Sequence, residues 1–280
     1  MPVITKMVGG CVRSSRIRVL LALFALGTAT LAILPSTAGA KGGVLRVACN
    51  YSNSRQVDPI VSFGRATSAH MHDFYGNTGV TANSTLSSLL STPSNCRGEP
   101  QNHSGYWVPT MYLRGQAVHA PKLAVYYSRF PGGQIAETIP QGLKMVAGNH
   151  DATGPQPIGI VKWDCLGNPQ APLRAAPYNC APYHATVQAT IKFPNCWNGK
   201  GLNTSDVVYP GKHEVCPPGF PHILPHIRES IETTIVNPLN ANGSVAISFS
   251  SGPYYTLHAD VFEAWEQSRI NLLLRSNGII

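Results

Sequence analysis

The sequence predicts a mainly β protein: an antiparallel, sandwich-like fold with long loops, one short helix and a C-terminal helix, stapled by disulfides. Charged residues make up only 12% of the chain, whereas 26 glycines and 23 prolines interrupt it, a composition that suits short strands joined by turns. β-Branched and aromatic residues collect in short runs between those turns, as they do in strands. An even number of cysteines follows residue 40.

The first 40 residues are predicted to be a secretory signal peptide. Three arginines precede a short apolar run at 19–34, a proline ends that run, and Ala-Gly-Ala follows up to residue 40, which is the order of n-region, h-region and cleavage site. The run is shorter than the ~20 apolar residues that a spanning helix needs. We therefore expect 41–280 to form a single, exported β-rich domain that is secreted to the cell envelope or beyond it, monomeric and without a membrane span.

The charge of the exported part argues against a nucleic-acid partner. The leader holds four of the 21 basic residues and none of the 13 acidic ones, so its removal lowers the net charge from +8 to +4. The remaining charges are scattered and form no basic stripe of the kind that nucleic-acid-binding proteins carry. A weak attraction to acidic polysaccharide is compatible with this balance.

Six cysteines remain after the leader, and an even count in an exported chain predicts disulfides. Six cysteines allow 15 pairings, of which we favour the sequential one. The predicted bonds are Cys49–Cys96, Cys165–Cys180 and Cys196–Cys216. The last two would close short loops rich in proline and glycine.

Eight runs of alternating or β-branched residues predict strands. In chain order they are 44–52, 106–113, 123–130, 142–148, 158–163, 185–193, 233–237 and 245–250. Two stretches predict helices, a short one at 84–91 and a longer one at 259–276. In the second, Asp260 is expected to be the N-cap with Glu263 as its capping-box partner.

The stretch "SAHMHDFYGNTG" (68–79) contains the strongest candidate site residues. If it is extended, His70 and His72 point to the same face of a strand and Asp73 to the other. His258 and Asp260 form a second cluster near the C-terminus. If the clusters meet, His70, His72 and His258 could bind a divalent metal, Zn or Mn, with one carboxylate. Without metal, the same groups suit acid–base catalysis.

Less specific interpretations of these residues remain open. A histidine in a loop rich in glycine and asparagine is often only a hydrogen-bonding residue, and Asp260 could be an N-cap alone. His222 and His226 would pair only on a helix, which Pro221 and Pro225 oppose.

Aromatic residues in two strand-like runs are candidates for sugar binding. Tyr106, Trp107 and Tyr126 are predicted to stack on sugar rings, although aromatic residues in strands also build cores. The nucleophile elbow, the Walker loop, the H-E-x-x-H motif and the Rossmann glycine pattern are missing from the sequence, which removes the enzyme classes that depend on them.

Several segments together resemble a known family. They are "SAHMHDFYGNTGVTANST" (68–85), "GYWVPTMY" (105–112), "IPQGLKMVAGN" (139–149), "IKFPNCWNGKGLNTSD" (191–206) and "SGPYYTLHADVFEAWE" (251–266). The family is an uncharacterised domain of unknown function in exported actinobacterial and fungal proteins, with a Ser-x-His-x-His-Asp-Phe-Phe-Gly-Asn motif. The resemblance implies no reaction. A histidine pair expected shortly after the Cys-Trp block is replaced here by "SDVVYPGKHEVCP" (205–217), where only His213 remains.

Two functions fit these features. The first is an exported carbohydrate-active enzyme that degrades extracellular or cell-wall polysaccharide with metal assistance, in which Asp73 or Asp260 orients the histidines. The alternative is a non-catalytic cell-wall or glycan-binding module, which needs the aromatic surface but no converging histidines. A structural envelope protein with separate, buried histidines is a third interpretation.

Overall fold

The computed structural model describes residues 43–67, 70–129 and 135–280. The predicted signal peptide therefore lies outside the described residues. Within the described ranges, no helix has the length and apolar character needed to cross a membrane.

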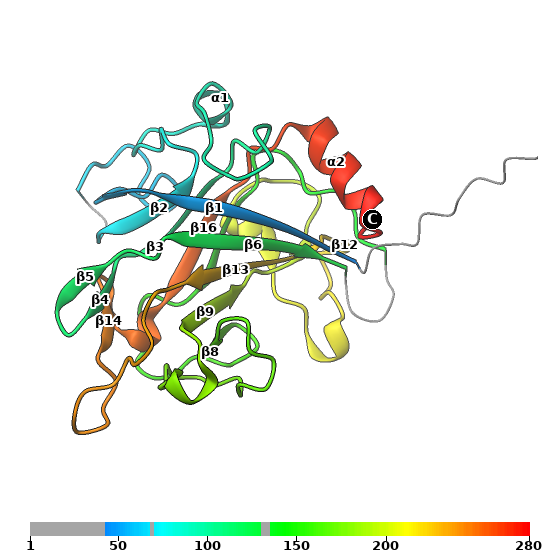
Figure 1. Cartoon of the computed structure of the whole chain (residues 1–280). Coiled ribbons are helices and arrows are strands. Elements are labelled where there is room, and N and C mark those ends of the chain that lie inside the picture. The colour runs from blue at the N-terminus through cyan, green and yellow to red at the C-terminus, as the bar shows by residue number, and fades with distance from the viewer. Residues whose placement is uncertain (1–42, 68–69, 130–134) are drawn as a thin grey trace, which may run out of the picture. The chain divides into compact units, whose positions relative to one another are not determined.

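A nine-stranded antiparallel sheet forms the framework of the domain (Figure 1). Its strands lie in the order β7 (Lys144–Gly148), β16 (His258–Phe262), β3 (Gly105–Pro109), β2 (His72–Gly76), β1 (Val44–Arg55), β6 (Lys122–Ser128), β13 (His226–Glu232), β9 (Val187–Lys192) and β8 (Val161–Cys165). Every neighbouring pair is antiparallel, so the predicted mainly β, antiparallel class is confirmed.

Two small sheets and several short helices complete the fold. One sheet joins β11 (Val207–Val208), β10 (Cys196–Trp197) and β12 (His222–Ile223), and the other joins β15 (Gly252–Pro253), β14 (Ile247–Phe249), β4 (Met111–Leu113) and β5 (Gln116–Val118). The α-helices are α1 (Leu86–Leu90) and α2 (Gln267–Ser276), and the 3₁₀ helices are η1 (Ala181–Tyr183), η2 (Thr204–Asp206), η3 (Lys212–Glu214) and η4 (Tyr254–Thr256).

The long strand β1 divides the large sheet into two halves. Its first part pairs with β6 and its last part with β2, and the register shifts between Tyr51 and Asn53. A shift of this kind bends a strand and lets it change partners at a corner. The half containing β2, β3, β16 and β7 can therefore pack against the half containing β6, β13, β9 and β8.

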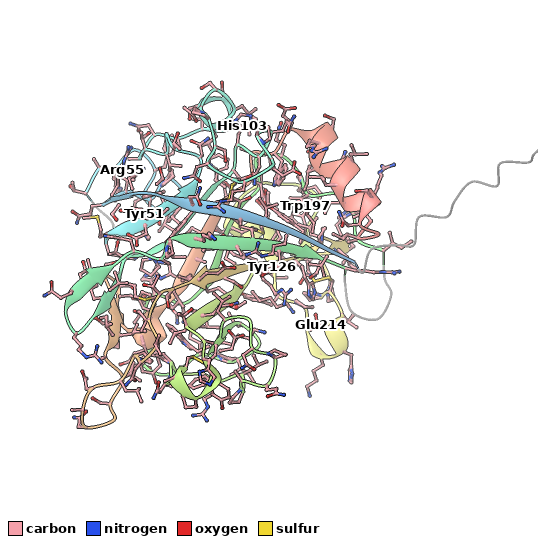
Figure 2. All side chains as sticks on the ribbon, viewed as in Figure 1. Tyr51, Arg55, His103, Tyr126, Trp197 and Glu214 are labelled. Atoms are coloured by element: carbon pink, nitrogen blue, oxygen red, sulfur yellow. A yellow bond between two sulfur atoms is a disulfide. The ribbon has the colours of Figure 1, made fainter. Side chains whose placement is uncertain are left out.

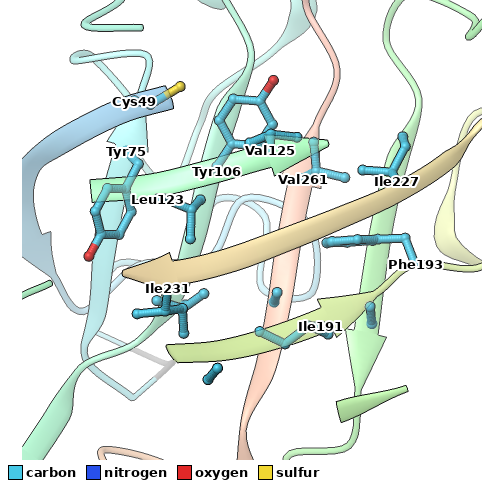
Figure 3. Packing of buried hydrophobic residues seen from close by; sticks show 14 of the residues in the cluster. Cys49, Tyr75, Tyr106, Leu123, Val125, Ile191, Phe193, Ile227, Ile231 and Val261 are labelled. Atoms are coloured by element: carbon cyan, nitrogen blue, oxygen red, sulfur yellow. The ribbon is translucent and has the colours of Figure 1, made fainter. Parts of the chain in front are cut away.

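The core lies between these halves and is built by strand alternation. Leu123 and Val125 of β6 point into it, and Tyr106 and Val261 enter from the other half (Figure 3). Tyr127 of β6 belongs to the same core. The hydroxyl groups of Tyr106 and Tyr127 lie 2.9 Å apart in a hydrogen bond between the halves.

A second apolar cluster covers the opposite face of β2, β3 and β16. Phe74, Trp107 and Phe262 pack there against Leu89 of α1. The central strands of this half are therefore buried on both faces, which leaves little room for polar side chains unless they form a site.

The two predicted helices exist, but the second begins later than expected. The structure starts α2 at Gln267, and 258–262 form the strand β16, so the prediction of a helix from 259 is wrong. Asp260 is not an N-cap. β16 pairs with β3 on one side and β7 on the other, and this pairing outweighs the local capping signal.

Two strand predictions also need correction. The expected strand at 106–113 is divided at Thr110 into β3 and β4. The expected strand at 233–237 is wrong, because the pairing segment is β13, which ends at Glu232. β13 reads "HIRESIE", and its inward-facing Glu229 breaks the apolar alternation that would have revealed it.

All three disulfides are present and join the predicted partners, Cys49–Cys96, Cys165–Cys180 and Cys196–Cys216. The first ties β1 to the segment after α1. The second links the end of β8 to η1, and the third closes the segment that contains η2 and η3.

Candidate metal centre

The structure brings together the three histidines that the sequence singled out. His70 precedes β2, His72 opens β2, and His258 opens β16, with β3 between the two strands. One ring nitrogen of each histidine lies within 4.8 Å of one ring nitrogen of the other two. The Nε2 atoms of His70 and His258 are 3.1 Å apart.

Backbone carbonyls fix the orientation of two of these rings. Nδ1 of His72 lies 3.1 Å from the carbonyl oxygen of Val57, and Nδ1 of His258 lies 3.0 Å from that of Thr256. A carbonyl only accepts, so each Nδ1 carries the hydrogen and each Nε2 presents a lone pair. Metal-binding histidines are commonly oriented by this kind of contact.

Two carboxylates complete the cluster. Asp260 follows His258 by two residues and therefore shares its face of β16. Asp58, His72 and Asp260 form a second group whose ligand atoms all lie within 4.8 Å of one another. The backbone N–H groups of Ile60 and Val61 donate to Oδ1 of Asp58 at 2.9 and 3.0 Å.

Asp260 and His72 are the least satisfied members of the cluster. Both are completely buried, and neither oxygen of Asp260 nor Nε2 of His72 has a hydrogen-bond partner among the described residues. An orphaned buried polar group is costly. A cation between these atoms would compensate all of them at once.

Burial sets the charge state of the cluster. It lowers the pKa of His72 well below the ordinary value, with a further contribution from the neighbouring His70 and His258. It also lowers the pKa of His258 to about 4 and lowers that of His70. Burial raises the pKa of Asp260 well above its usual range, and Asp58 raises it further. The imidazoles are therefore neutral at pH 7, as metal ligands must be.

These groups fit a divalent metal ion. Three imidazoles with a carboxylate suit Zn²⁺ and other borderline ions. Two nitrogens that each lie ~2.1 Å from one ion are about 3.0 to 3.4 Å apart, depending on the angle between them, and the separation of 3.1 Å between His70 and His258 falls in that range. In a metal-free protein, His70 would instead donate its Nε2–H to His258.

A small cavity gives access to the cluster. Its volume is about 160 Å³, and it is lined by Asp58, Val61, Ser62, His70, Val146, His150, His258 and Asp260. Val61 and His150 are exposed at its rim, and the ring of His150 lies 5.9 Å from that of His258. A small molecule can therefore reach the ligand atoms from solvent.

Gly148 allows β7 to approach His258 closely. It pairs directly with His258 and has a φ of +82°. A Cβ atom there would lie 2.6 Å from the carbonyl oxygen of Leu257 and 2.9 Å from Cα of His258. A side chain at this position would push the two strands apart.

Asp73 does not face the histidines. It points to the opposite side of β2, where the hydroxyls of Ser54 and Thr110 each donate to Oδ1 at 2.6 Å. His119 Nδ1 lies 2.9 Å from Oδ2. The expectation that Asp73 could orient the site histidines is therefore not supported, because strand alternation separates them.

The predicted aromatic platform does not form. Tyr106 and Trp107 are completely buried, since β3 is covered on both faces. Tyr126 is partly exposed, but the guanidinium groups of Arg46 and Arg228 lie over its ring at 5.7 and 5.2 Å.

Two residues of the cluster escaped the sequence analysis. Asp58 stands alone before a proline, and His150 is a single histidine in a loop-like stretch of sequence. Only their three-dimensional proximity identifies them. His213, the residue left where relatives were expected to carry a histidine pair, is exposed in η3 and takes no part in the cluster.

Comparison with known proteins gives a family but no reaction. No curated protein and no solved structure matches the chain. The family described as "Domain of unknown function (DUF1996)" matches residues 58–265, a range that begins at Asp58 and includes every member of the histidine and aspartate cluster. The chain belongs to the DUF1996 family.

Proposed function

We propose that the protein is an exported, metal-dependent enzyme that cleaves polysaccharide. His70, His72, His258 and Asp260 would hold one divalent ion, with Zn²⁺ or Mn²⁺ as the candidates. The observation that supports this best is a group of three imidazole nitrogens within 4.8 Å of one another, which His72 joins to a completely buried carboxylate without a hydrogen-bond partner among the described residues, beside a cavity open to solvent.

The chemistry expected of such a site is hydrolysis. A bound ion would act as a Lewis acid and lower the pKa of a water molecule. Asp58 is positioned to accept a proton, because two backbone N–H groups hold one of its oxygens and leave the other available. Burial raises the pKa of Asp58 above the ordinary value, which brings it closer to the range useful for proton transfer near neutral pH. His150 lies at the exposed rim of the same cavity.

A neighbouring hollow supports a substrate larger than a single small molecule. Its volume is about 360 Å³, and Phe63, Leu202 and Phe262 supply apolar walls while Lys144 and Asn203 supply polar groups. Residues of β7 and β16 line both this hollow and the cavity beside the histidines. Phe262 follows Asp260 by two residues on β16, and Lys144 precedes Val146 by two on β7. Apolar walls with a few polar groups suit a sugar ring.

Export is supported by the three disulfides, which form and persist in oxidising compartments. The alternative of a non-catalytic glycan-binding module loses much of its motivation, because two of the three predicted aromatic contacts are buried.

The test combines metal analysis with an activity assay. Elemental analysis of the secreted protein is expected to find about one Zn or Mn ion per chain. Release of reducing ends from a panel of wall polysaccharides is expected to depend on that ion. His72→Gln and His258→Gln should lose both metal and turnover, while His184→Asn, a change at an exposed histidine outside the cluster, should keep both.

Each other result has a definite meaning. A protein that binds metal and retains a glycan without releasing products would be a binding module. A folded protein that binds no divalent ion would overturn the proposed metal centre and the enzymatic function together.

A further inference from the structure

The face of the large sheet that points away from the core carries an ordered set of long and short side chains. One row across four neighbouring strands consists of Arg46, Tyr126, Arg228 and Lys192, each directly opposite the next. The adjacent row consists of Ala48, Ala124, Ser230, Thr190 and Lys162. Four of the five side chains in the second row are small, so the long side chains of the first row stand above a depression. Tyr126, labelled in Figure 2, marks this face.

A hollow of about 330 Å³ lies at the end of these rows, where β8, β9 and β13 meet. We call it the basic hollow. Lys162, Lys192 and Arg228 project into it, and Thr190, Glu214 and Ile158 form part of its wall. None of its lining residues belongs to the metal centre, so it does not depend on that proposal.

Positive charge in the basic hollow is only partly balanced. Lys192 Nζ lies 3.4 Å from a carboxylate oxygen of Glu214. Lys162 and Arg228 form no ion pair with any acidic residue in the described part of the chain. In addition, Nε of Arg228 is buried without a hydrogen-bond partner among the described residues. Arg46, in the same row, differs because Glu232 accepts a hydrogen bond from it at 2.5 Å.

The electrostatics agree with a shortage of negative charge. Burial lowers the pKa of Lys162 and the neighbouring Arg228 lowers it further, and Asp164 offsets the two effects only in part. Like charges that are partly removed from water repel one another more strongly than they would in bulk solvent. Binding of an anion would relieve this repulsion and give the buried Nε–H of Arg228 an acceptor.

We infer that the basic hollow binds an oxyanion group of a ligand, namely a sulfate, phosphate or carboxylate, through Arg228 and Lys162 with Lys192 at its edge. The planar guanidinium offers two parallel N–H donors to such a group, and the ammonium adds a point charge. Tyr126 holds the guanidinium in place, with Cζ of Arg228 5.2 Å from the ring centre. The hollow is large enough for an anionic sugar unit as well as for an inorganic ion.

The experiment is titration calorimetry on the exported protein at low ionic strength with three probes. They are inorganic phosphate, inorganic sulfate and trigalacturonate. Lys162→Met is expected to weaken binding of at least one probe about tenfold or more, since a hydrogen bond to a charged group contributes that much. Lys162→Arg should retain most of the affinity, and Lys200→Met, at an exposed lysine outside the hollow, should bind like the wild type.

The three probes distinguish the sources of the anion. If trigalacturonate binds more tightly than either inorganic ion, the natural ligand is a carboxylate carried on sugar. If an inorganic ion binds as tightly as trigalacturonate, the site recognises the oxyanion group alone. Both outcomes support the inference. Absence of binding by all three probes, or wild-type affinity in Lys162→Met, overturns it. Arg228→Gln is a second variant, and it should weaken binding as Lys162→Met does. Thermal unfolding of each variant tests whether it is folded.

Discussion

Asp260 is the residue on which the proposed metal centre depends most. It is completely buried, and none of the described residues donates a hydrogen bond to its carboxylate. The change Asp260→Asn keeps the shape but removes the negative charge. We expect it to lower the affinity for Zn²⁺ on the order of 100-fold, because losing an outer partner of a ligand alone costs 10- to 100-fold.

Competition with a metal-binding dye measures that affinity, and the metal-free variant should unfold no more readily than the metal-free wild type. Unchanged affinity would show that Asp260 is not a ligand.

Glu263, just after β16, gives a prediction about pH. Its carboxylate accepts hydrogen bonds from Ser104 Oγ and Tyr127 OH, both at 3.2 Å, yet burial raises its pKa to about 7. The folded state therefore holds a proton between pH ~4.5 and ~7 that the unfolded state releases, and the contribution of Glu263 to stability falls as pH rises through this window. Glu263→Gln removes the effect.

The free energy of unfolding of Glu263→Gln relative to the wild type should thus rise by about 2 to 3 kcal/mol between pH 5 and pH 8. Chemical denaturation at several pH values measures the difference. Glu266→Gln, at an exposed position three residues later, is the control and should show no such trend. A constant difference between Glu263→Gln and the wild type would contradict the prediction.

At the residue scale, sequence reasoning identified the histidines but not their setting. The spacing of His70 and His72 predicted a shared face, and alternation predicted that Asp73 would point away. Both follow from local geometry alone. Asp58 and His150 reach the cluster only through the fold, because each comes from a segment whose local sequence carries no ligand pattern.

At the scale of single elements, the largest error in the predicted structure is the helix expected to begin at 259, where the chain forms β16. Asp260 and Glu263 have the spacing of a capping box, and the residues around them also suit a helix start. The structure uses them in β16 and in the segment that follows, where all five strand residues are buried between two partner strands. A buried central strand has no alternating polar face, so its sequence does not reveal it. The same error left the shared face of His258 and Asp260 unexplained, since the predicted helix began at 259 and His258 lay outside it, whereas both residues belong to β16.

The pairing of β7 with β16 supports a prediction at this scale. Gly148→Ala introduces a Cβ atom 2.6 Å from a backbone oxygen at a position with positive φ, so both strain and overlap destabilise the fold. We expect a loss of about 2 kcal/mol or more, together with weaker metal binding because His258 is displaced.

Gly115→Ala is the matched control. Gly115 has a similar φ of +78° but no atom within 4 Å of the added Cβ, so only the conformational cost of ~1 kcal/mol should remain. Thermal unfolding and metal titration measure both effects. Equal losses in the two variants would show that the close approach of β7 has no separate role.

At the scale of the whole molecule, composition predicted the class of fold but not the sheet order. Gly, Pro and cysteine content predicted a disulfide-linked β protein, and the sequential pairing was the favoured one of 15, with short loops supporting two of its three bonds. The order of the nine strands depends on the bend of β1 and on pairings such as β16 with β3, which join residues more than 150 positions apart. No local pattern encodes such pairings. Charged residues on β13 obscured one of them, because Glu229 faces the core.

This long-range topology would make the proposed metal centre a crosslink within the fold. The histidines at 70 and 258 are 188 residues apart in sequence, and one ion bound to both would favour the folded state alone. A ligand present at 100 times its Kd stabilises a protein by about 2.7 kcal/mol, which corresponds to a rise in Tm of about 5 to 10 °C for a domain of this size. Zn²⁺ or Mn²⁺ added to chelator-treated protein should produce that rise in a thermal melt, and EDTA should reverse it. His258→Gln should melt at the same temperature with and without the ion, whereas His184→Asn should respond like the wild type. If the ion raises Tm equally in His258→Gln and in the wild type, it binds elsewhere, and the cluster between β2 and β16 is no metal centre.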